Sequence, residues 1–389
     1  MKNFLKSLVK VYSFPGSLLL TAIILNVMIL IGCKKEITSL QDEQKSERNK
    51  NGESEYEGSP KLRVHPGGSI QAAVDAARPG TVILIDPGLY KEAIVVNKPG
   101  ILLIGVSNGV IIQNPGEEEN GITVMDRGDG FVLKNVIVKN FEENGVLLDH
   151  VNGFLLSHVT AIDNGEYGLF PVFSTNGVID HCTASGHSDT GIYVGQSSNV
   201  VMDFNTAFAN VNGLEVENSK HVIVTHNQSF NNSAGLLIIL LPGLEVKSAS
   251  DILVYKNNFY NNNLANFAPP EGGFESLIPN GIGILLLGAD RTTILENTIS
   301  GNKFVGIATI SVLVLGAIAG LPPSAFADIE PNPDGTRIRK NVLTNNGYSP
   351  PATLPFPGVD LLWDGSGTDN CWKGNIFTTS YPSPLPVCL

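Results

Sequence analysis

The chain has 389 residues, of which 42% are hydrophobic and 16% are charged, and its formal net charge is −12 at pH 7. An acidic surface repels phosphate backbones and anionic lipid headgroups, so this composition argues against a nucleic-acid partner. By length the chain holds either two or three compact domains or one repetitive domain that grows along an axis.

The first 32 residues have the layout of a bacterial lipoprotein export signal. Three lysines precede an apolar run at 18–31, which ends in a Leu-Ile-Gly-Cys lipobox. In such signals the cysteine becomes the lipidated first residue, so Cys33 is the predicted lipidation site. A plain transmembrane anchor is the alternative, but the run is shorter than the about 20 residues that such a span needs. Lys34 stands where an aspartate retains many lipoproteins at the inner membrane. We therefore predict a lipid anchor at the outer membrane or cell surface.

Residues 33–60 carry many charges and few apolar side chains, so they are predicted to be a disordered tether. The segment 69–77 follows, with a serine that can cap a helix and apolar residues at helical spacing. Next come the strand-like sequence TVILIDPGLY and further strand-like sequence. This order resembles the N-terminal cap of the pectate-lyase-like β-helix superfamily. The resemblance implies that the helix closes the first end of a β-helix.

Residues 120–240 contain a glycine that returns every 22–24 residues: Gly121, Gly145, Gly168, Gly191, Gly213 and Gly235. The residue after each glycine and the residue two further on are apolar in every repeat. This period of two predicts a strand with one buried face. The residues between them are predicted to point outward: Thr123, Leu147, Phe170, Tyr193, Glu215 and Leu237.

A second apolar row about ten residues upstream of the glycines predicts another inward-facing strand: Val132, Leu155, Val178, Met202 and Val224. Turn residues stand three positions after this row: Asn135, His158, His181, Asn205 and Asn227. Asparagine tolerates left-handed backbone angles and can stack on its copy in the next coil. The predicted fold is therefore all-β, a single-stranded right-handed parallel β-helix with about 22–24 residues per coil and an N-terminal capping helix. It forms one domain over residues 61–389.

The repeat continues beyond residue 240 with insertions, of which the segments near 265–280 and 316–335 are rich in proline and glycine. Long loops of a solenoid often gather on its binding face. The outward positions of these later coils are apolar: Leu237, Ile239, Leu285, Leu287, Ala308 and Ile310. Two interpretations stay open, that the insertions cover this face or that it binds a partner or lipid. A membrane span at 304–320 fits the composition, but its length and the coil phase at Gly306 speak against it.

Three cysteines remain besides Cys33. Cys371 and Cys388 lie close enough in sequence to bridge the C-terminal end, which export makes plausible. Cys182 falls within a coil strand and is predicted to be a small buried thiol.

The candidate ligand-binding residues gather on the coils at Gly168 to Gly213: Tyr167, Asp189, Tyr193, Glu215 and Glu217. Aromatic faces beside carboxylates suit a neutral sugar chain or an acidic one bridged by Ca²⁺. Carboxylates two positions before the glycines also form an acidic ladder that Ca²⁺ would suit: Glu119, Glu143, Glu166 and Asp189. These rows hold no lysine or arginine to neutralise a uronate, so binding is favoured over catalysis. Catalytic residues and metal ligands stay unassigned, and Ca²⁺ is the one cofactor suggested.

The sequence from Tyr167 to Val172 resembles the Tyr-Gly-Phe-Asp-Pro-His motif of alginate epimerases at Tyr167, Gly168 and Pro171. The acid and imidazole positions of that motif are Phe170 and Val172 here. The residues that would transfer protons are therefore missing from this motif.

From about Leu62 to its end, and most closely at 166–201 and 212–238, the chain resembles a family of exported bacterial proteins, often lipoproteins, called parallel β-helix repeat proteins. The resemblance implies the fold and the compartment rather than an activity. Three functions stay open. The chain binds a carbohydrate or an envelope protein, or it is a polysaccharide lyase or epimerase, or it assists the maturation of a metal enzyme. The third would use His150, His158 and His181 as metal ligands.

Overall fold

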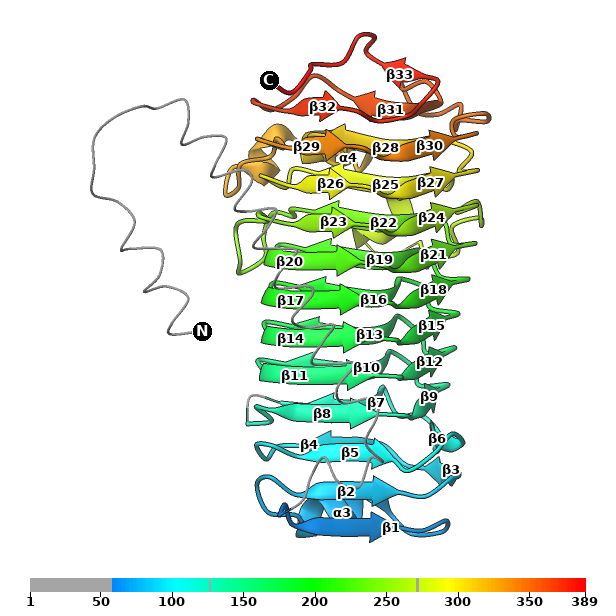
Figure 1. Cartoon of the computed structure of the whole chain (residues 1–389), viewed down its shortest axis with the longest axis vertical. Helices are drawn as coiled ribbons and strands as arrows, with labels where there is room; N and C mark the ends of the chain where they lie inside the picture. The colour runs from blue at the N-terminus through cyan, green and yellow to red at the C-terminus, as the bar shows by residue number, and fades with distance from the viewer. Residues whose placement is uncertain (1–57, 126, 271–272) are drawn as a thin grey trace, which may run out of the picture. The chain divides into compact units, whose positions relative to one another are not determined.

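The computed structural model describes residues 58–125, 127–270 and 273–389. The predicted export signal, Cys33 and nearly all of the predicted tether lie outside the described residues. Within the described part, strands return to three positions in successive coils and pair in parallel with their copies, so that three long sheets form (Figure 1). This arrangement is a parallel β-helix, as the sequence predicts.

Sheet A contains β1 (Lys61–Val64), β2 (Val82–Ile85), β5 (Leu102–Gly105), β8 (Phe131–Lys134), β11 (Asn152–Ser157), β14 (Thr175–Asp180), β17 (Ser198–Asp203), β20 (Lys220–Thr225), β23 (Leu253–Tyr255), β26 (Thr293–Leu295), β29 (Arg337–Arg339) and β32 (Cys371–Lys373). Sheet B contains β3 (Gly88–Lys91), β6 (Val110–Gln113), β9 (Ile137–Lys139), β12 (Thr160–Ile162), β15 (Thr183–Ser185), β18 (Thr206–Phe208), β21 (Gln228–Phe230), β24 (Asn258–Tyr260), β27 (Thr298–Ser300) and β30 (Val342–Thr344). Sheet C contains β4 (Ile94–Val96), β7 (Asn120–Val124), β10 (Asn144–Asp149), β13 (Tyr167–Val172), β16 (Thr190–Gly195), β19 (Asn212–Glu217), β22 (Ala234–Ile239), β25 (Ile282–Leu287), β28 (Val305–Ile310), β31 (Val359–Trp363) and β33 (Ser380–Tyr381).

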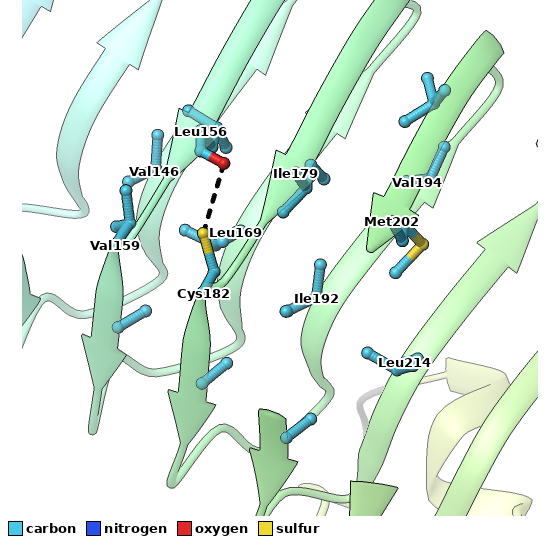
Figure 2. Packing of buried hydrophobic residues seen from close by; sticks show 14 of the residues in the cluster. Val146, Leu156, Val159, Leu169, Ile179, Cys182, Ile192, Val194, Met202 and Leu214 are labelled. Carbon is cyan, nitrogen blue, oxygen red and sulfur yellow. Dashed lines mark hydrogen bonds between the residues drawn. The ribbon is translucent and has the colours of Figure 1, made fainter. Parts of the chain in front are cut away.

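The first inward-facing row lies where the sequence predicts it. In sheet C, Val146 pairs in register with Ile122 on one side and Leu169 on the other, and all three side chains are fully buried. Cys182 is also buried, and its Sγ donates a hydrogen bond of 3.4 Å to the carbonyl oxygen of Leu156 (Figure 2). The core is therefore a column of equivalent apolar side chains, one set per coil.

The repeating glycines stand where no side chain would fit. A Cβ atom at Gly145 would lie 2.6 Å from the carbonyl oxygen of Gly168 and 2.7 Å from Nδ2 of Asn164, and both groups belong to the next coil. Carbon atoms do not approach nitrogen or oxygen so closely without a bond. The glycine spacing that reveals the coil length is thus a steric requirement of stacking.

In three coils, the inward-facing residue of the second row lies one position further along the chain than predicted. Leu156 pairs with Ile179, and Ile179 pairs with Met202, and these side chains are fully buried. Met202 and Val224 point inward as predicted, whereas three residues of the predicted row are half-buried on the outside of sheet A: Val132, Leu155 and Val178. These strands are apolar on both faces, so apolarity alone does not fix which residues face the core.

Two ladders of asparagine side chains connect the coils at their corners. Between sheets A and B, the Nδ2 of each asparagine donates to Oδ1 of the next at 2.9–3.0 Å along Asn205, Asn227, Asn257, Asn297, Asn341 and Asn375. Between sheets B and C, the distances are 3.0–3.2 Å along Asn210, Asn232, Asn262, Asn302 and Asn346. The predicted stacking is confirmed.

The residue with left-handed backbone angles is the one before each asparagine of the first ladder. Phe204 and His226 have φ of 54° and 51° there. Asn135, His158 and His181 occupy this preceding position in the earlier coils, with φ of 57°, 56° and 52°. They are therefore equivalent to Phe204 and His226 rather than to Asn205 and Asn227, which corrects the predicted row.

A helix closes the first end of the β-helix, as predicted. Helix α3 (Ile70–Ala76) begins after Ser69, whose side chain accepts a hydrogen bond from the backbone N–H of Ala72. Its buried residues Ile70 and Val74 join the main core. Near the other end, Cys371 and Cys388 form a disulfide bond. These are the two cysteines that the sequence suggests as partners.

The apolar outer face of sheet C is covered by the insertions. The segment after β28 forms α4 (Val312–Ile318) and the short helix η2 (Pro323–Phe326), and the segment after β24 forms the short helix η1 (Gly273–Leu277). Side chains from these segments bury the outward residues of β22, β25 and β28 in a second hydrophobic cluster. Of the two interpretations, the covered face is therefore correct. No helix in the described part of the chain is long and apolar enough to span a membrane.

Candidate functional site

The five candidate binding residues come together on the outer face of sheet C. Tyr193 of β16 pairs in register with Glu215 of β19, and Glu217 lies two residues further along β19. Tyr167 begins β13 and Asp189 directly precedes β16. The period-two alternation of three successive strands therefore brings these side chains to one place.

Three aromatic rings form one wall of the site. Tyr167 and Phe170 stack with ring centroids 4.2 Å apart, and Tyr193 packs against them at centroid distances of 5.2 and 4.7 Å. A Cβ at Gly195 would lie 2.0 Å from the Tyr193 hydroxyl, so the glycine provides the space for this ring. Tyr193 is outside the core, as predicted, but its neighbours leave only 4% of it exposed. The site is thus more enclosed than the outward positions of these residues alone would indicate.

Each tyrosine hydroxyl donates a hydrogen bond to a carboxylate. The Tyr167 hydroxyl lies 2.5 Å from Oδ2 of Asp189, and the Tyr193 hydroxyl lies 2.6 Å from Oε1 of Glu217. Burial is the main cause that raises the pKa of both phenols well above the usual 10, and the nearby carboxylates add to it. Both tyrosines therefore stay protonated donors at neutral pH.

The Thr190 hydroxyl lies between two of the carboxyl groups. Thr190 Oγ1 lies 2.9 Å from Oδ1 of Asp189 and 2.5 Å from Oε2 of Glu215. It has one proton to donate, which the two carboxyl oxygens share or compete for. Burial, reinforced by the charges of Asp189 and Glu217, raises the pKa of Glu215 well above its ordinary value and so favours its protonated form.

The other carboxyl groups titrate near neutral pH. Burial raises the pKa of Asp189 to about 6 and that of Glu217 to about 7. It also raises the pKa of Glu275 to about 7, with the charge of Asp189 adding to the effect. The site therefore contains one carboxyl group whose pKa is raised well above normal beside others that change charge around pH 6–7, an arrangement suited to proton transfer.

These residues enclose a small cavity of about 40 Å³, which we call the acid–tyrosine pocket. It is lined by Tyr167, Asp189, Glu215, Glu217, Leu237, Ile239, Leu241, Phe274, Glu275 and Ile278. No lysine or arginine occurs among these lining residues. Glu275, Phe274 and Ile278 could not be predicted from the repeat, because a repeat does not show where an insertion folds back. Thr190 could have been found, since polar residues precede several of the repeating glycines.

The carboxylates of the predicted acidic ladder do stack on successive coils. The backbone N–H of Glu166 donates to the carbonyl oxygen of Glu143, and that of Asp189 donates to the carbonyl oxygen of Glu166. Burial, followed by the charges of Glu119 and Glu166, raises the pKa of Glu143. Neighbouring carboxylates along this edge therefore repel one another.

Potential metal ligands converge elsewhere in the described residues. Three ligand atoms lie within 4.8 Å of one another in two groups, His158 with Asp180 and His181, and Asp290 with Glu330 and Asp334. The carboxyl groups of the acid–tyrosine pocket belong to neither group. His150 belongs to a different corner, where it lies 2.6 Å from Asp149 and stacks on Phe173. The predicted trio of histidines is therefore not one site.

Comparison with known proteins identifies the fold. A family model described as right-handed beta helix region matches residues 120–240. No curated protein matches the chain in sequence. Among solved structures, the chain is similar to the A-modules of two mannuronan C-5 epimerases from Azotobacter vinelandii. AlgE4 has 19% identity and a TM-score of 0.57 over 80% of this chain and 93% of that chain, and AlgE6 has 15% identity and a TM-score of 0.58 over 80% and 94%.

The chain is also similar to DFA-IIIase from Arthrobacter chlorophenolicus A6, with 12% identity and a TM-score of 0.51 over 81% of this chain and 94% of that chain. At these identities the likeness concerns the fold alone. Together with the family model, it confirms the predicted fold class, and the described chain is a right-handed parallel β-helix.

Proposed function

We propose that this chain binds a neutral polysaccharide on the outer face of sheet C, as a lipid-anchored protein of the cell envelope. The observation that carries the proposal is the acid–tyrosine pocket, where four carboxyl groups and a phenol meet with no cationic side chain among the lining residues. Carboxylates accept hydrogen bonds from sugar hydroxyls, and aromatic rings pack against the apolar faces of sugar rings. Both kinds of group are present side by side.

The size of the pocket indicates which part of a sugar it receives. A cavity of about 40 Å³ is a few times the roughly 10–15 Å³ of cavity volume that one water molecule needs. It accepts a hydroxyl or hydroxymethyl group rather than a whole sugar ring. The ring itself then lies outside, against the half-buried Tyr167 and Phe170.

The rest of the face supports an extended ligand. The outward residues of β7, β10 and β13, namely Thr123, Leu147 and Phe170, are half-buried, whereas the insertions cover those of β22, β25 and β28. A polysaccharide that crosses the strands of sheet C would therefore run over β7 to β13 and end at the pocket. Because the apolar face is buried, a glycan ligand is favoured over an envelope protein.

The charge of the site favours a neutral polymer over a uronate. The epimerases with the same fold carry mannuronan in their names, and a mannuronan is acidic. The lining of this pocket provides no lysine or arginine to pair with a substrate carboxylate, and its own carboxylates would repel one. Phe170 and Val172 stand where the alginate epimerase motif has its acid and its imidazole, which also argues against a uronate substrate.

A second candidate function is cleavage or transfer at a glycosidic bond. The close approach of Glu215 and Asp189 around Thr190 favours it, because burial raises the pKa of Glu215 well above that of a normal carboxyl while Asp189 and Glu217 ionise near pH 6–7. A protonated acid and a carboxylate are the two groups that glycoside chemistry needs. Incubation with neutral oligosaccharides would then produce new reducing ends or transfer products, and Glu215→Gln would abolish them.

A glycan array with the full chain, followed by calorimetry on the glycans that bind, tests the proposal. Glu217→Gln, which replaces a carboxyl group by a neutral amide, and Tyr167→Phe, which removes a hydroxyl, should each weaken binding by about 10-fold or more, because a hydrogen bond to a charged group contributes about 1.5–3 kcal/mol. Glu118→Gln, at an exposed position, is the control and should bind like the unaltered chain. Equal affinity of all four proteins would place the ligand elsewhere.

A further inference from the structure

We propose that the corner between sheets A and B binds a divalent transition metal ion such as Zn²⁺, with His158, Asp180 and His181 as ligands. One possible ligand atom from each of these residues lies within 4.8 Å of the others. They lie on the corner that follows β11 and β14, whereas the acid–tyrosine pocket lies on sheet C. The site is therefore separate from the proposed glycan site.

The repeat itself places the two imidazoles together. His158 and His181 hold the same corner position in adjacent coils, and both have left-handed backbone angles. Their rings stack in parallel, with centroids 4.9 Å apart and planes 3° from parallel. Asp180 ends β14 and lies in register with Ser157, beside His158. Its Oδ2 is 3.0 Å from Nδ1 of His181.

Asp180 provides a second and independent observation. Only 7% of this residue is exposed, and its Oδ1 is buried with no hydrogen-bond partner among the described residues. A buried carboxylate oxygen without a partner is costly. A cation held between Asp180 and the imidazoles would satisfy this oxygen.

The donor set selects the class of metal. Imidazole nitrogens suit Zn²⁺, Cu²⁺ and Ni²⁺, whereas Ca²⁺ and Mg²⁺ prefer oxygen ligands throughout. Zinc lies about 2.0–2.1 Å from each imidazole nitrogen, so two such nitrogens are at most about 4.2 Å apart. In a tetrahedral site they are about 3.4 Å apart, so from a limit of 4.8 Å the two nitrogens must approach each other by up to about 1.4 Å. Since His158 is exposed, a fourth coordination position stays open to solvent or to a bound group.

The site is confined to one pair of coils. Phe204 takes the equivalent corner position in the next coil and stacks on His181 at 5.2 Å. His226 follows after Phe204, at 4.6 Å from its ring, and lies 3.0 Å from Asp203. His226 is therefore in the same row but has no neighbouring imidazole, which makes it a matched control.

Calorimetric titration of the tag-free full chain with Zn²⁺, after removal of metals with a chelator, tests the proposal. Asparagine is the appropriate substitution, because Asn135 holds the same corner position one coil earlier with φ of 57°. We expect one strong site per chain. His158→Asn and His181→Asn should weaken it by at least about 100-fold, since loss of an outer-shell partner alone costs up to about that much. His226→Asn should leave the affinity unchanged.

Circular dichroism of each variant shows that it is folded, so a loss of binding reports on the site. Asp180→Asn, which keeps the shape of the side chain and removes its charge, should also weaken binding. The proposal is wrong if the unaltered chain binds no Zn²⁺, if His181→Asn binds as tightly as the unaltered chain, or if His226→Asn weakens binding equally. The last result would indicate scattered surface histidines rather than one site.

Discussion

The substitution Glu217→Gln should make the stability of the folded chain less dependent on pH. In the folded chain the pKa of Glu217 is raised to about 7 by burial, whereas the ordinary value for the unfolded chain is 4.5. A raised pKa means that the folded chain keeps this proton at pH values where the unfolded chain has released it. The stabilisation from Glu217 is therefore complete below about pH 4.5 and is lost as the pH rises through 7.

The size of the effect follows from the two pKa values. Each unit of difference corresponds to about 1.36 kcal/mol, so the interval from 4.5 to about 7 corresponds to up to about 3 kcal/mol. Between pH 4.5 and 8, the free energy of unfolding of Glu217→Gln should fall by up to about 3 kcal/mol less than that of the unaltered chain. Asp189, whose pKa is raised to about 6, keeps contributing a decrease of the same sign in both proteins.

Urea denaturation, followed by circular dichroism at a series of pH values, measures these free energies. Glu118→Gln, which removes an exposed carboxylate, is the control and should follow the unaltered chain. If Glu217→Gln loses as much stability between pH 4.5 and 8 as the unaltered chain does, then Glu217 titrates normally and its burial in the acid–tyrosine pocket does not raise its pKa.

Three further predictions concern other parts of the chain. Val194→Asp places an unpaired charge in the fully buried core and should lower the free energy of unfolding by several kcal/mol, whereas Tyr193→Phe, which keeps the ring, should cost about 1–2 kcal/mol in the same urea assay. Asn257→Ala removes the acceptor for the backbone N–H and Nδ2 of Asn227 and one of the two donors to Oδ1 of Asn297, and should cost several kcal/mol, seen as a lower urea midpoint; an unchanged midpoint would refute a structural role of the ladder. Cys33→Ser should abolish the incorporation of labelled fatty acid in cells, and continued labelling would exclude Cys33 as the lipid site.

The coil architecture could be predicted because each coil has the same steric requirement at the same position. Gly145 and its equivalents have no room for a side chain, so the spacing of these glycines in the sequence equals the length of one coil. The sheet C strands alternate cleanly, and the outward positions of Tyr193 and Glu215 follow from that alternation. In sheet A, the strand at Phe154 to Leu156 is apolar at every position, and the phase of the alternation was wrong there.

The enclosure of the site could not be predicted, because it depends on where insertions fold. Glu275 lies far along the chain from Asp189, and no repeat relates the two. The contacts of Thr190 Oγ1 with Asp189 and Glu215 likewise depend on side-chain positions that the sequence pattern does not specify. The pairing of His158 with His181 was within reach of the sequence, since both residues are at equivalent positions 23 residues apart. That His150 does not belong to the same site as His158 and His181 could be seen only in the structure, where it lies at a different corner.

The central claim is that a glycan binds across sheet C with one polar group in the acid–tyrosine pocket, and a crystal structure of the complex tests it most directly. The full chain would be crystallised with the glycan that binds most tightly on the array. We predict electron density for a sugar over Tyr167 and Phe170, with one hydroxyl or hydroxymethyl group within hydrogen-bond distance of Glu217 or Glu275. Density for the sugar on sheet A or sheet B, with the pocket unchanged, would contradict the account.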